Sequence, residues 1–346
     1  MPNERGRRRW LTASELHHVV CKVVKLALLL AVGAIACDRG RSNPPSPTPS
    51  LDPPAPAAPQ PKPTSCTLSP VALRYPMPKR LVAIGDLHGD LAGMRSALVA
   101  AGAIDDKDTW IGGDLMIVQT GDVLDRGDDE QSLLDQFERL EREAAAAGGR
   151  FVWLLGNHEL MNAAGDLRYV TAGGFRDFED VKGLPLDRYA DVPEPARARV
   201  AALAPGGPYA QVLAGQHLAV VVGDTVFVHG GIRPDQVADL PADLARARCW
   251  LAGQGDPPHG LTDSDGPVWD RSFAMGDGDC AALDESLRAL GVARMVVGHT
   301  VQPRGITSAC DGKVWRIDVG LARHYGGPSQ ALELGPDGPR VLGAAK

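Results

Sequence analysis

The chain has 346 residues, of which 44% are hydrophobic and 23% charged, an ordinary balance for a globular protein. Its formal net charge of −7 lacks the basic character that nucleic-acid-binding proteins usually show, so we expect no nucleic-acid partner. The composition is not uniform, because the first 65 residues differ from the rest in charge and proline content.

An export signal is predicted at residues 1–37. Arginines and lysines precede an apolar run at 26–36, "LALLLAVGAIA", which is followed by Cys37. Eleven apolar residues are too few to span a bilayer, which needs about 20, and the pattern is typical of a secretory signal. The "AIAC" ending resembles a bacterial lipoprotein box, in which Cys37 carries the lipid. We therefore expect an exported lipoprotein, anchored to a membrane by its N-terminal lipid and facing the periplasm or cell exterior. The alternatives are an ordinary cleaved signal or a start codon assigned too far upstream.

A stiff tether is predicted at residues 38–65. Residues 41–64 contain ten prolines in 24 positions, a composition that cannot bury a core and favours extended polyproline II. Simple disorder is the alternative. The remainder, residues 66–346, is large for one domain but within reach of a sandwich or α/β fold.

Four cysteines lie in this exported domain, namely Cys66, Cys249, Cys280 and Cys310. They could form two disulfides, with three possible pairings. None of them has the CxxC spacing of a metal site.

Five apolar strands are predicted, and a tight glycine turn carrying Asp, His or Asn follows each of them. The strands are "RLVAI" (80–84), "LMIVQT" (115–120), "FVWLL" (151–155), "TVFV" (225–228) and "ARMVV" (293–297). Helical stretches near 91–101 and 130–146 follow the first two. Strand–helix alternation indicates α/β layering, in which ligands collect at the carboxyl ends of the strands. The five polar clusters are therefore expected to converge in space.

The converging side chains offer a specific donor set. It consists of carboxylate and amide oxygens and imidazole nitrogens, from Asp86, His88, Asp122, Asn157, His229 and His299. This mixture suits Zn, Fe or Mn and lacks the thiolates of a structural zinc site. Asp122, on the middle loop, could bridge two ions. Such a pair lowers the pKa of a water between the ions and stabilises an in-line displacement.

The motifs resemble those of the calcineurin-like metallophosphoesterases. They occur in the order GD-x-HG (85–89), GD-x-x-DRG (121–127), GNHE (156–159), HGG (229–231) and GH (298–299). The DRG and GNHE endings resemble the phosphoprotein-phosphatase branch, and the fuller strings are most similar to bacterial Shewanella-like protein phosphatases. The resemblance implies an α/β, four-layer metallophosphoesterase fold, a β-sandwich flanked by helices. Residues 160–215 match that branch least and are expected to form an insert over the cleft.

The resemblance also implies roles for the ligands. Asp86 and His88 would hold the first divalent ion together with Asp122. The second ion would be held by Asp122 again, with Asn157, His229 and His299.

Four further residues would carry the reaction in this resemblance. His158 resembles the general acid, and Asp125 resembles the carboxylate that keeps it protonated. Arg126 supplies a planar fork for phosphate oxygens. Arg271, in "GPVWDRSF" (266–273), is a candidate second phosphate-binding arginine, with a surface salt bridge as the alternative.

Other polar residues near the motifs receive structural interpretations. Asp128, Asp129 and Glu130 are expected to be solvated acids at the start of a helix. Glu159 is expected to tie down its own loop.

The sequence thus predicts a dinuclear metal-dependent phosphomonoester hydrolase, most similar to protein phosphatases, with phospho-Ser/Thr or phospho-Tyr left open. A small phosphate ester, a nucleotide or a dinucleoside polyphosphate is the alternative substrate. A different class of alternative is a non-catalytic metal- or phosphate-binding surface lipoprotein, against which the intact set of ligands argues.

Overall fold

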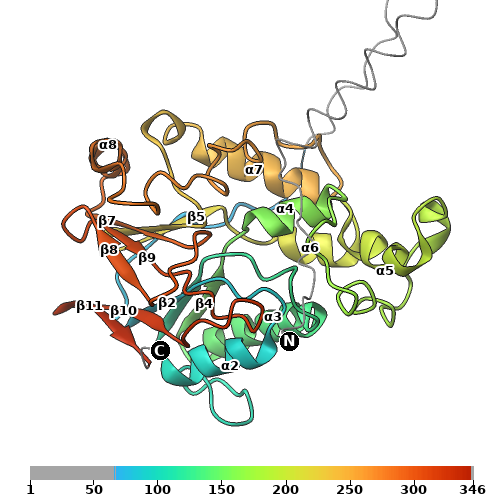
Figure 1. The fold of residues 1–346 in the computed structure, drawn as a ribbon, viewed down its shortest axis with the longest axis horizontal. Coiled ribbons are helices and arrows are strands. Elements are labelled where there is room, and N and C mark those ends of the chain that lie inside the picture. Colours follow the sequence, from blue (N-terminus) through green and yellow to red (C-terminus); the bar gives the residue numbers. More distant parts are fainter. Residues whose placement is uncertain (1–65, 67, 344–346) are drawn as a thin grey trace, which may run out of the picture. The chain divides into compact units, whose positions relative to one another are not determined.

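The computed structural model describes Cys66 and residues 68–343, which are drawn in colour in Figure 1. The predicted export signal, its Cys37 and the tether at 38–65 all lie outside the described residues. Among the residues that are described, no helix combines the length and apolar character needed to cross a membrane.

One sheet has five strands, in the order β11-β10-β2-β3-β4. The strands are β2 (Leu81–Ile84), β3 (Met116–Gln119), β4 (Arg150–Trp153), β10 (Ala331–Gly335) and β11 (Gly338–Leu342). β2, β3 and β4 are parallel and in register, so that Ile84 pairs with Gln119 and Gln119 with Trp153. Their carboxyl ends therefore meet at one edge of the sheet, as the sequence predicts.

The other sheet has six strands, in the order β1-β5-β6-β7-β9-β8. The strands are β1 (Arg74–Tyr75), β5 (Ala219–Val222), β6 (Thr225–Val228), β7 (Arg294–Val297), β8 (Thr307–Ala309) and β9 (Val314–Arg316). β6, β7 and β9 are parallel neighbours, which again brings three carboxyl ends to one edge.

Seven α-helices surround the sheets within the described part of the chain. They are α2 (Leu91–Ala100), α3 (Glu130–Ala146), α4 (Asn157–Ala163), α5 (Glu194–Leu203), α6 (Pro208–Ala214), α7 (Leu240–Leu251) and α8 (Cys280–Leu290), with short 3₁₀ helices η1 (Leu186–Tyr189) and η2 (Pro234–Gln236). The buried face of α3 includes Leu133, Phe137 and Leu140, the spacing of one helical face. The two predicted helices are confirmed at α2 and α3.

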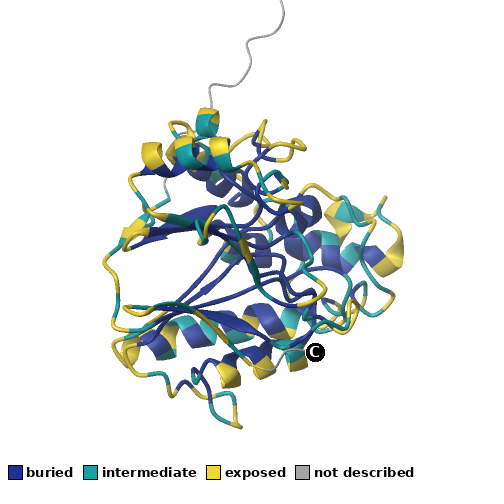
Figure 2. Cartoon of the chain, turned by 60° about the vertical axis from the view of Figure 1, so that its left-hand side comes forward, coloured by how far each residue is buried: buried dark blue, intermediate teal, exposed yellow. Residues whose placement is uncertain are grey.

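The layers follow from which faces are apolar. Leu81, Ala83 and Val118 of one sheet pack against Phe227 and Val296 of the other, which makes a core between the sheets. The opposite face of the five-stranded sheet packs against α2 and α3, and the opposite face of the six-stranded sheet packs against α8. Figure 2 shows this arrangement of buried sheets with helices outside. The predicted four-layer sandwich flanked by helices is confirmed.

The segment expected to be an insert, residues 160–215, contains most of α4 and then η1, α5 and α6. α5 contacts α4, η1 and α6, and α6 packs against α7.

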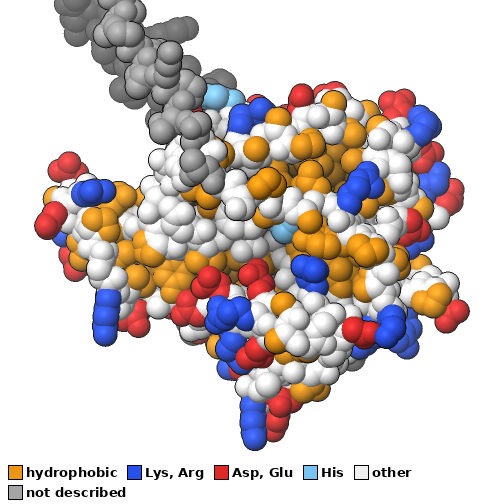
Figure 3. Space-filling model, turned by 180° about the vertical axis from the view of Figure 1, so that it is seen from behind, with side chains coloured by type: hydrophobic (Ala, Val, Ile, Leu, Met, Phe, Trp, Pro, Cys, Tyr) orange, Lys and Arg blue, Asp and Glu red, His pale blue; other side chains and the backbone are white. Residues whose placement is uncertain are grey.

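Two disulfides link the four cysteines of the domain. Cys66 pairs with Cys249 of α7, and Cys280 at the start of α8 pairs with Cys310 after β8. The structure thus selects one of the three pairings that the sequence allows. On the face seen in Figure 3, acidic and basic side chains are interspersed rather than gathered by sign.

Candidate metal centre

The carboxyl ends of the two sheets meet at one site. The loops after β2, β3 and β4 come from one sheet, and those after β6, β7 and β9 come from the other. His229 Nδ1 lies 2.8 Å from the carbonyl oxygen of Thr120, and this hydrogen bond joins the two sets of loops. The predicted convergence of remote loops is therefore present.

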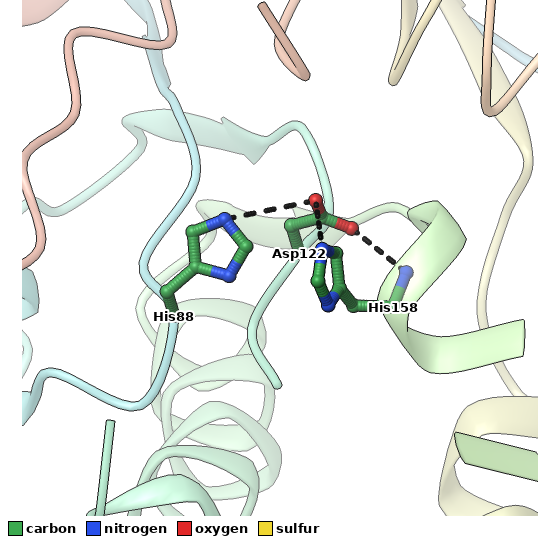
Figure 4. Close-up of side chains that lie close together, drawn as sticks. All are labelled: His88, Asp122 and His158. Atoms are coloured by element: carbon green, nitrogen blue, oxygen red, sulfur yellow. Dashed lines mark hydrogen bonds and ion pairs between the residues drawn. The ribbon is translucent and has the colours of Figure 1, made fainter. Parts of the chain in front are cut away.

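A first group of side chains consists of His88, Asp122 and His158. Asp122 Oδ2 lies 3.8 Å from His88 Nε2 and 3.7 Å from His158 Nε2, and Figure 4 shows both rings turned toward this carboxylate. The ligand atoms of the three residues all lie within 4.8 Å of one another. His158, predicted as an acid rather than a ligand, thus stands among the metal-capable groups.

A second group shares Asp122 with His229 and His299, again with ligand atoms within 4.8 Å. Asp122 Oδ2 lies 3.2 Å from His229 Nε2. The side-chain oxygen of Asn157 lies 3.1 Å from the same nitrogen. One carboxylate therefore belongs to both groups, which is what a residue bridging two ions requires.

Asp86 lies beside these groups but belongs to neither. Its carboxylate Oδ2 accepts a hydrogen bond from the backbone N–H of His299 at 3.0 Å. Asp318, which was not among the predicted site residues, lies near it after β9 and is also buried. Burial raises the pKa of Asp86, and the charges of Asp318 and Asp122 raise it further, well above its usual value.

The protonation states of His88, His299 and Asp122 suit cation binding. Burial lowers the pKa of His229, but the charge of Asp122 outweighs this and raises it. Burial lowers the pKa of His88 to about 4, and burial together with the nearby His229 lowers that of His299, so both rings are neutral at pH 7. Burial alone would raise the pKa of Asp122, but the imidazoles of His229 and His158 outweigh it and hold that pKa well below its usual value. Neutral imidazole and ionised carboxylate are the forms that bind metals.

Two further observations fit a metal at this site. His299, a member of the second group, has a buried Nε2 with no hydrogen-bond partner among the described residues. A Cβ on Gly156 would lie 2.1 Å from Asp122 Oδ1, and one on Gly298 would lie 2.4 Å from Asp86 Oδ1. Glycine is required at both positions because backbone approaches the carboxylates so closely.

His158 and Asp125 form a hydrogen-bonded pair. His158 Nδ1 lies 2.5 Å from Asp125 Oδ2, and the Asp125 side chain is fully buried. Burial lowers the pKa of His158, but the charge of Asp122 and the hydrogen bond to Asp125 outweigh this and raise it. The predicted contact between these two residues is present.

Arg126 lines a cavity of about 460 Å³ next to His88. Its guanidinium carbon lies 4.5 Å from the ring centre of Tyr169 and 5.4 Å from that of Tyr325. Its Nε is buried without a hydrogen-bond partner among the described residues. Tyr169 belongs to the segment 160–215, and Thr171, Ala172 and Gly173 of the same segment line the cavity.

Arg271 lies beside His299 and Thr300. Its Nη1 donates to the carbonyl oxygen of His299 at 3.0 Å and lies 3.1 Å from Thr300 Oγ1. It is exposed and is not among the residues that line the cavity with Arg126. The structure thus brings Arg271 to the metal groups without bringing the two arginines to one cavity.

The interpretation of Glu130 as a solvated acid is wrong. Its side chain is fully buried, accepts hydrogen bonds from the backbone N–H of Asp125 and pairs with Arg199 of α5. Asp128, by contrast, is exposed, and Asp129 is partly so. Arg199 was missed because nothing in the local sequence of α5 distinguishes it from neighbouring arginines.

Asp318 could have been found from the sequence. It follows a short strand in "VWRIDVG", with a glycine two residues later, and the five recognised clusters also place a polar residue near a glycine after a strand. β9 is the parallel neighbour of β7, so its carboxyl end lies at the same edge.

Glu159 ties down the loops, as predicted. Its carboxylate accepts hydrogen bonds from four backbone N–H groups, those of Asp122, Val123, Leu124 and Gly156, at 2.7–3.1 Å. A carboxylate of the third loop therefore fixes the backbone of the second, on which the shared ligand stands.

Residues 79–303 match the calcineurin-like phosphoesterase family. Together with the two sheets and the shared carboxylate, this match defines the class, and the chain belongs to this family. The predicted resemblance is confirmed, and the protein is a metal-dependent phosphatase.

The chain is similar to several protein phosphatases. The chain is 41% identical over 307 residues to Shewanella-like protein phosphatase 2 of Arabidopsis thaliana, with 78% of each chain covered. It is 27% identical to Shewanella-like protein phosphatase 1 of Plasmodium berghei, covering 72% of this chain and 69% of that one. The crystal structure of the cold-active protein-tyrosine phosphatase of a psychrophilic Shewanella species is similar, with a TM-score of 0.64, 26% identity and coverage of 79% and 82%.

Replacing Glu159 by Gln is expected to destabilise the protein and weaken metal binding. An amide has one acceptor oxygen in place of two, so at least two buried N–H groups lose their partner, at about 1–3 kcal/mol each. We expect urea denaturation to show a loss of about 2–4 kcal/mol on this basis. Metal titration should show a lower affinity. The same change at the exposed Glu285 of α8 is the control, expected within about 0.5 kcal/mol. Equal stability of the two variants would contradict the role of Glu159.

Proposed function

We propose that the protein is a dinuclear phosphomonoester hydrolase that acts on phosphorylated protein side chains. The observation that carries this proposal is that the Asp122 carboxylate belongs to both groups of metal-capable side chains. The proposed ligands are Asp86, His88, Asp122, Asn157, His229 and His299, and the donor set suits two Mn, Fe or Zn ions. Bound there, the ions would supply a nucleophilic water and offset the charge of the phosphate.

The chain's own residues would bind the phosphate and protonate the leaving group. Arg126 is held between two tyrosine rings and presents its fork to the cavity, where it would bind equatorial phosphate oxygens. Arg271 would add positive charge on the His299 side. His158 would give the proton of its Nε2 to the departing oxygen, while Asp125 holds the opposite nitrogen of the ring.

The substrate we propose is a phosphotyrosine side chain. The rings of Tyr169 and Tyr325 flank Arg126, and Tyr169 also lies 5.1 Å, centre to centre, from the ring of His158. Aromatic walls beside a phosphate-binding arginine favour an aryl ester over the shorter side chains of phosphoserine and phosphothreonine. The similar solved structure of a protein-tyrosine phosphatase supports the same choice.

We also propose that the protein is an exported lipoprotein, anchored to a membrane at Cys37 and facing the periplasm or cell exterior. The support is the short apolar run 26–36 after a basic segment, with proline-rich residues 41–64 following as a spacer.

A mixed substrate panel tests the proposed function. We expect purified protein with added Mn²⁺ to release phosphate fastest from phosphotyrosine peptides, more slowly from phosphoserine and phosphothreonine peptides, and slowest from nucleotides and dinucleoside polyphosphates. Elemental analysis of the same protein should find close to two divalent ions per chain.

The control for that panel is Asp122→Asn. Because Asp122 is shared by both groups, we expect kcat/KM to fall by at least about 100-fold, since even outer partners of metal ligands are worth about 10- to 100-fold. Equal rates from the two proteins would rule out the dinuclear mechanism. Faster turnover of nucleotides than of peptides would contradict the proposed substrate but not the proposed dinuclear hydrolysis.

Replacing His158 by Asn separates an acid from a ligand. General acids contribute about 100- to 10,000-fold, so we expect a loss of at least about 100-fold on phenyl phosphate, whose leaving group needs a proton. On p-nitrophenyl phosphate we expect a loss below about tenfold, because its leaving group departs as a stable anion. Metal content should stay unchanged. Loss of metal from this variant would make His158 a ligand instead.

If Cys37 carries the lipid anchor, replacing Cys37 by Ser should remove the protein from the membrane fraction. In a bacterial host we expect the unaltered protein in the membrane fraction, carrying metabolically incorporated radiolabelled palmitate. The Cys37→Ser variant should carry no label. Label on both proteins, or on neither, would refute the anchor at Cys37.

A further inference from the structure

The insert reaches the active site through one buried arginine. Arg199 of α5 has no exposed side-chain surface, and hydrogen bonds engage all three of its guanidinium nitrogens. The acceptors are Asn162 Oδ1 at 2.9 Å, the carbonyl oxygen of Gly174 at 2.9 Å, Asp125 Oδ1 at 3.2 Å and both carboxylate oxygens of Glu130. A guanidinium has five N–H donors, and these five contacts use them all.

The two oxygens of the Asp125 carboxylate contact different partners, one the proposed acid and the other the insert. One oxygen, Oδ2, lies 2.5 Å from His158 Nδ1. The other, Oδ1, accepts from Arg199 and, at 3.0 Å, from the amide of Asn162. Rotation of this carboxylate would break contacts on both sides, so Arg199 and Asn162 fix the direction in which Asp125 faces the imidazole.

Glu130 completes the arrangement at the backbone. It binds the guanidinium of Arg199 in bidentate fashion and accepts from the N–H of Asp125. Asp125 has φ of +68°, in the left-handed region that a non-glycine residue adopts only when held there. The same cluster therefore holds both the main chain and the side chain of Asp125.

We propose that Arg199 is a positioning residue for proton transfer, through which the insert orients His158. The inference rests on the proposed function, because it takes His158 as the general acid. Packing gives no sufficient reason for the cluster, since an apolar side chain of similar volume is commonly as stabilising as a buried ion pair. α5 also buries Ala201, Ala202 and Leu203 without help from charge.

The test needs a variant that can fold. Arg199→Met alone leaves two buried carboxylates without their cation, so we pair it with Glu130→Gln, which removes one of those charges. Arg199→Lys is the second variant, because it keeps the charge but loses the planar fork. The matched control is Arg197→Ala on the same helix, since the hydrogen bonds of Arg197 within the described part of the chain go to the carbonyl oxygens of Ala190 and Val192 in the insert.

Two readouts distinguish positioning from folding. The first is the ratio of kcat on phenyl phosphate to kcat on p-nitrophenyl phosphate. The second is the proton NMR signal of His158 Nδ1–H, assigned by its absence from His158→Asn and independent of turnover. We expect the double variant to lose about tenfold or more in the kcat ratio, and Arg199→Lys to lose less, because only the first ester needs the acid. The NMR signal should weaken in the same order and persist in Arg197→Ala.

The contrary outcomes are distinct. Equal losses on both esters, or an unchanged signal with an unchanged ratio, would make Arg199 merely structural and overturn the proposal. If the double variant fails to fold, Arg199→Lys is judged by the same criteria. A changed ratio in His158→Asn but in no Arg199 variant refutes this inference alone. An unchanged ratio in His158→Asn refutes the acid assignment and this inference together.

Discussion

A concentration of buried negative charge at the meeting edge of two sheets governs the rest of this structure. Asp86, Asp122, Glu159 and Asp318 are each at most 2% exposed and lie within one site. Burying like charges together is costly, and it raises the pKa of Asp318 to about 6. Imidazoles offset part of this charge around Asp122, and backbone N–H groups solvate Glu159. The negative charge that is left unbalanced favours the binding of cations. The carboxylates cannot reduce their repulsion by moving apart, because the paired sheets hold them in place.

The backbone stores strain at the same place. Five non-glycine residues of the site have φ in the left-handed region, each at a cost of order 1 kcal/mol, and they are His88, Asp122, Asp125, Arg126 and His299. Two buried carboxylates sustain the strain on the second loop: Glu159 holds the N–H of Asp122, and Glu130 holds that of Asp125. These glutamates stabilise the loop indirectly, by making the strained turn the conformation in which its N–H groups are satisfied.

Local patterns in the sequence predicted five of the eleven strands of the described residues, two of their seven α-helices and the convergence of the polar loops. They were sufficient because each pattern combines a short apolar run with a glycine turn, and parallel pairing then dictates where the ends meet. No local pattern predicted the ion pair between Arg199 and Glu130. They lie 69 residues apart, and a charge at a helix start looks the same in sequence whether solvent or a distant arginine neutralises it. Only the packing of α5 against the loops decides between these states, and no short pattern encodes it.

The parts of the site differ in what supports them. The shared carboxylate and the imidazoles stand on strand ends, where hydrogen-bonded sheets and glycine contacts leave the side chains little freedom. The proposed acid stands at the start of α4, and Asp125, which contacts it, is held from the insert by Arg199. Tyr169, also from the insert, flanks the phosphate-binding arginine. Strand ends thus hold most of the groups suited to cations, whereas Tyr169 and Arg199 of the insert contact Arg126 and Asp125, which would act on the ester. Changes in that segment would alter which leaving groups are accepted while preserving the metal-capable groups, because the two sets have different supports.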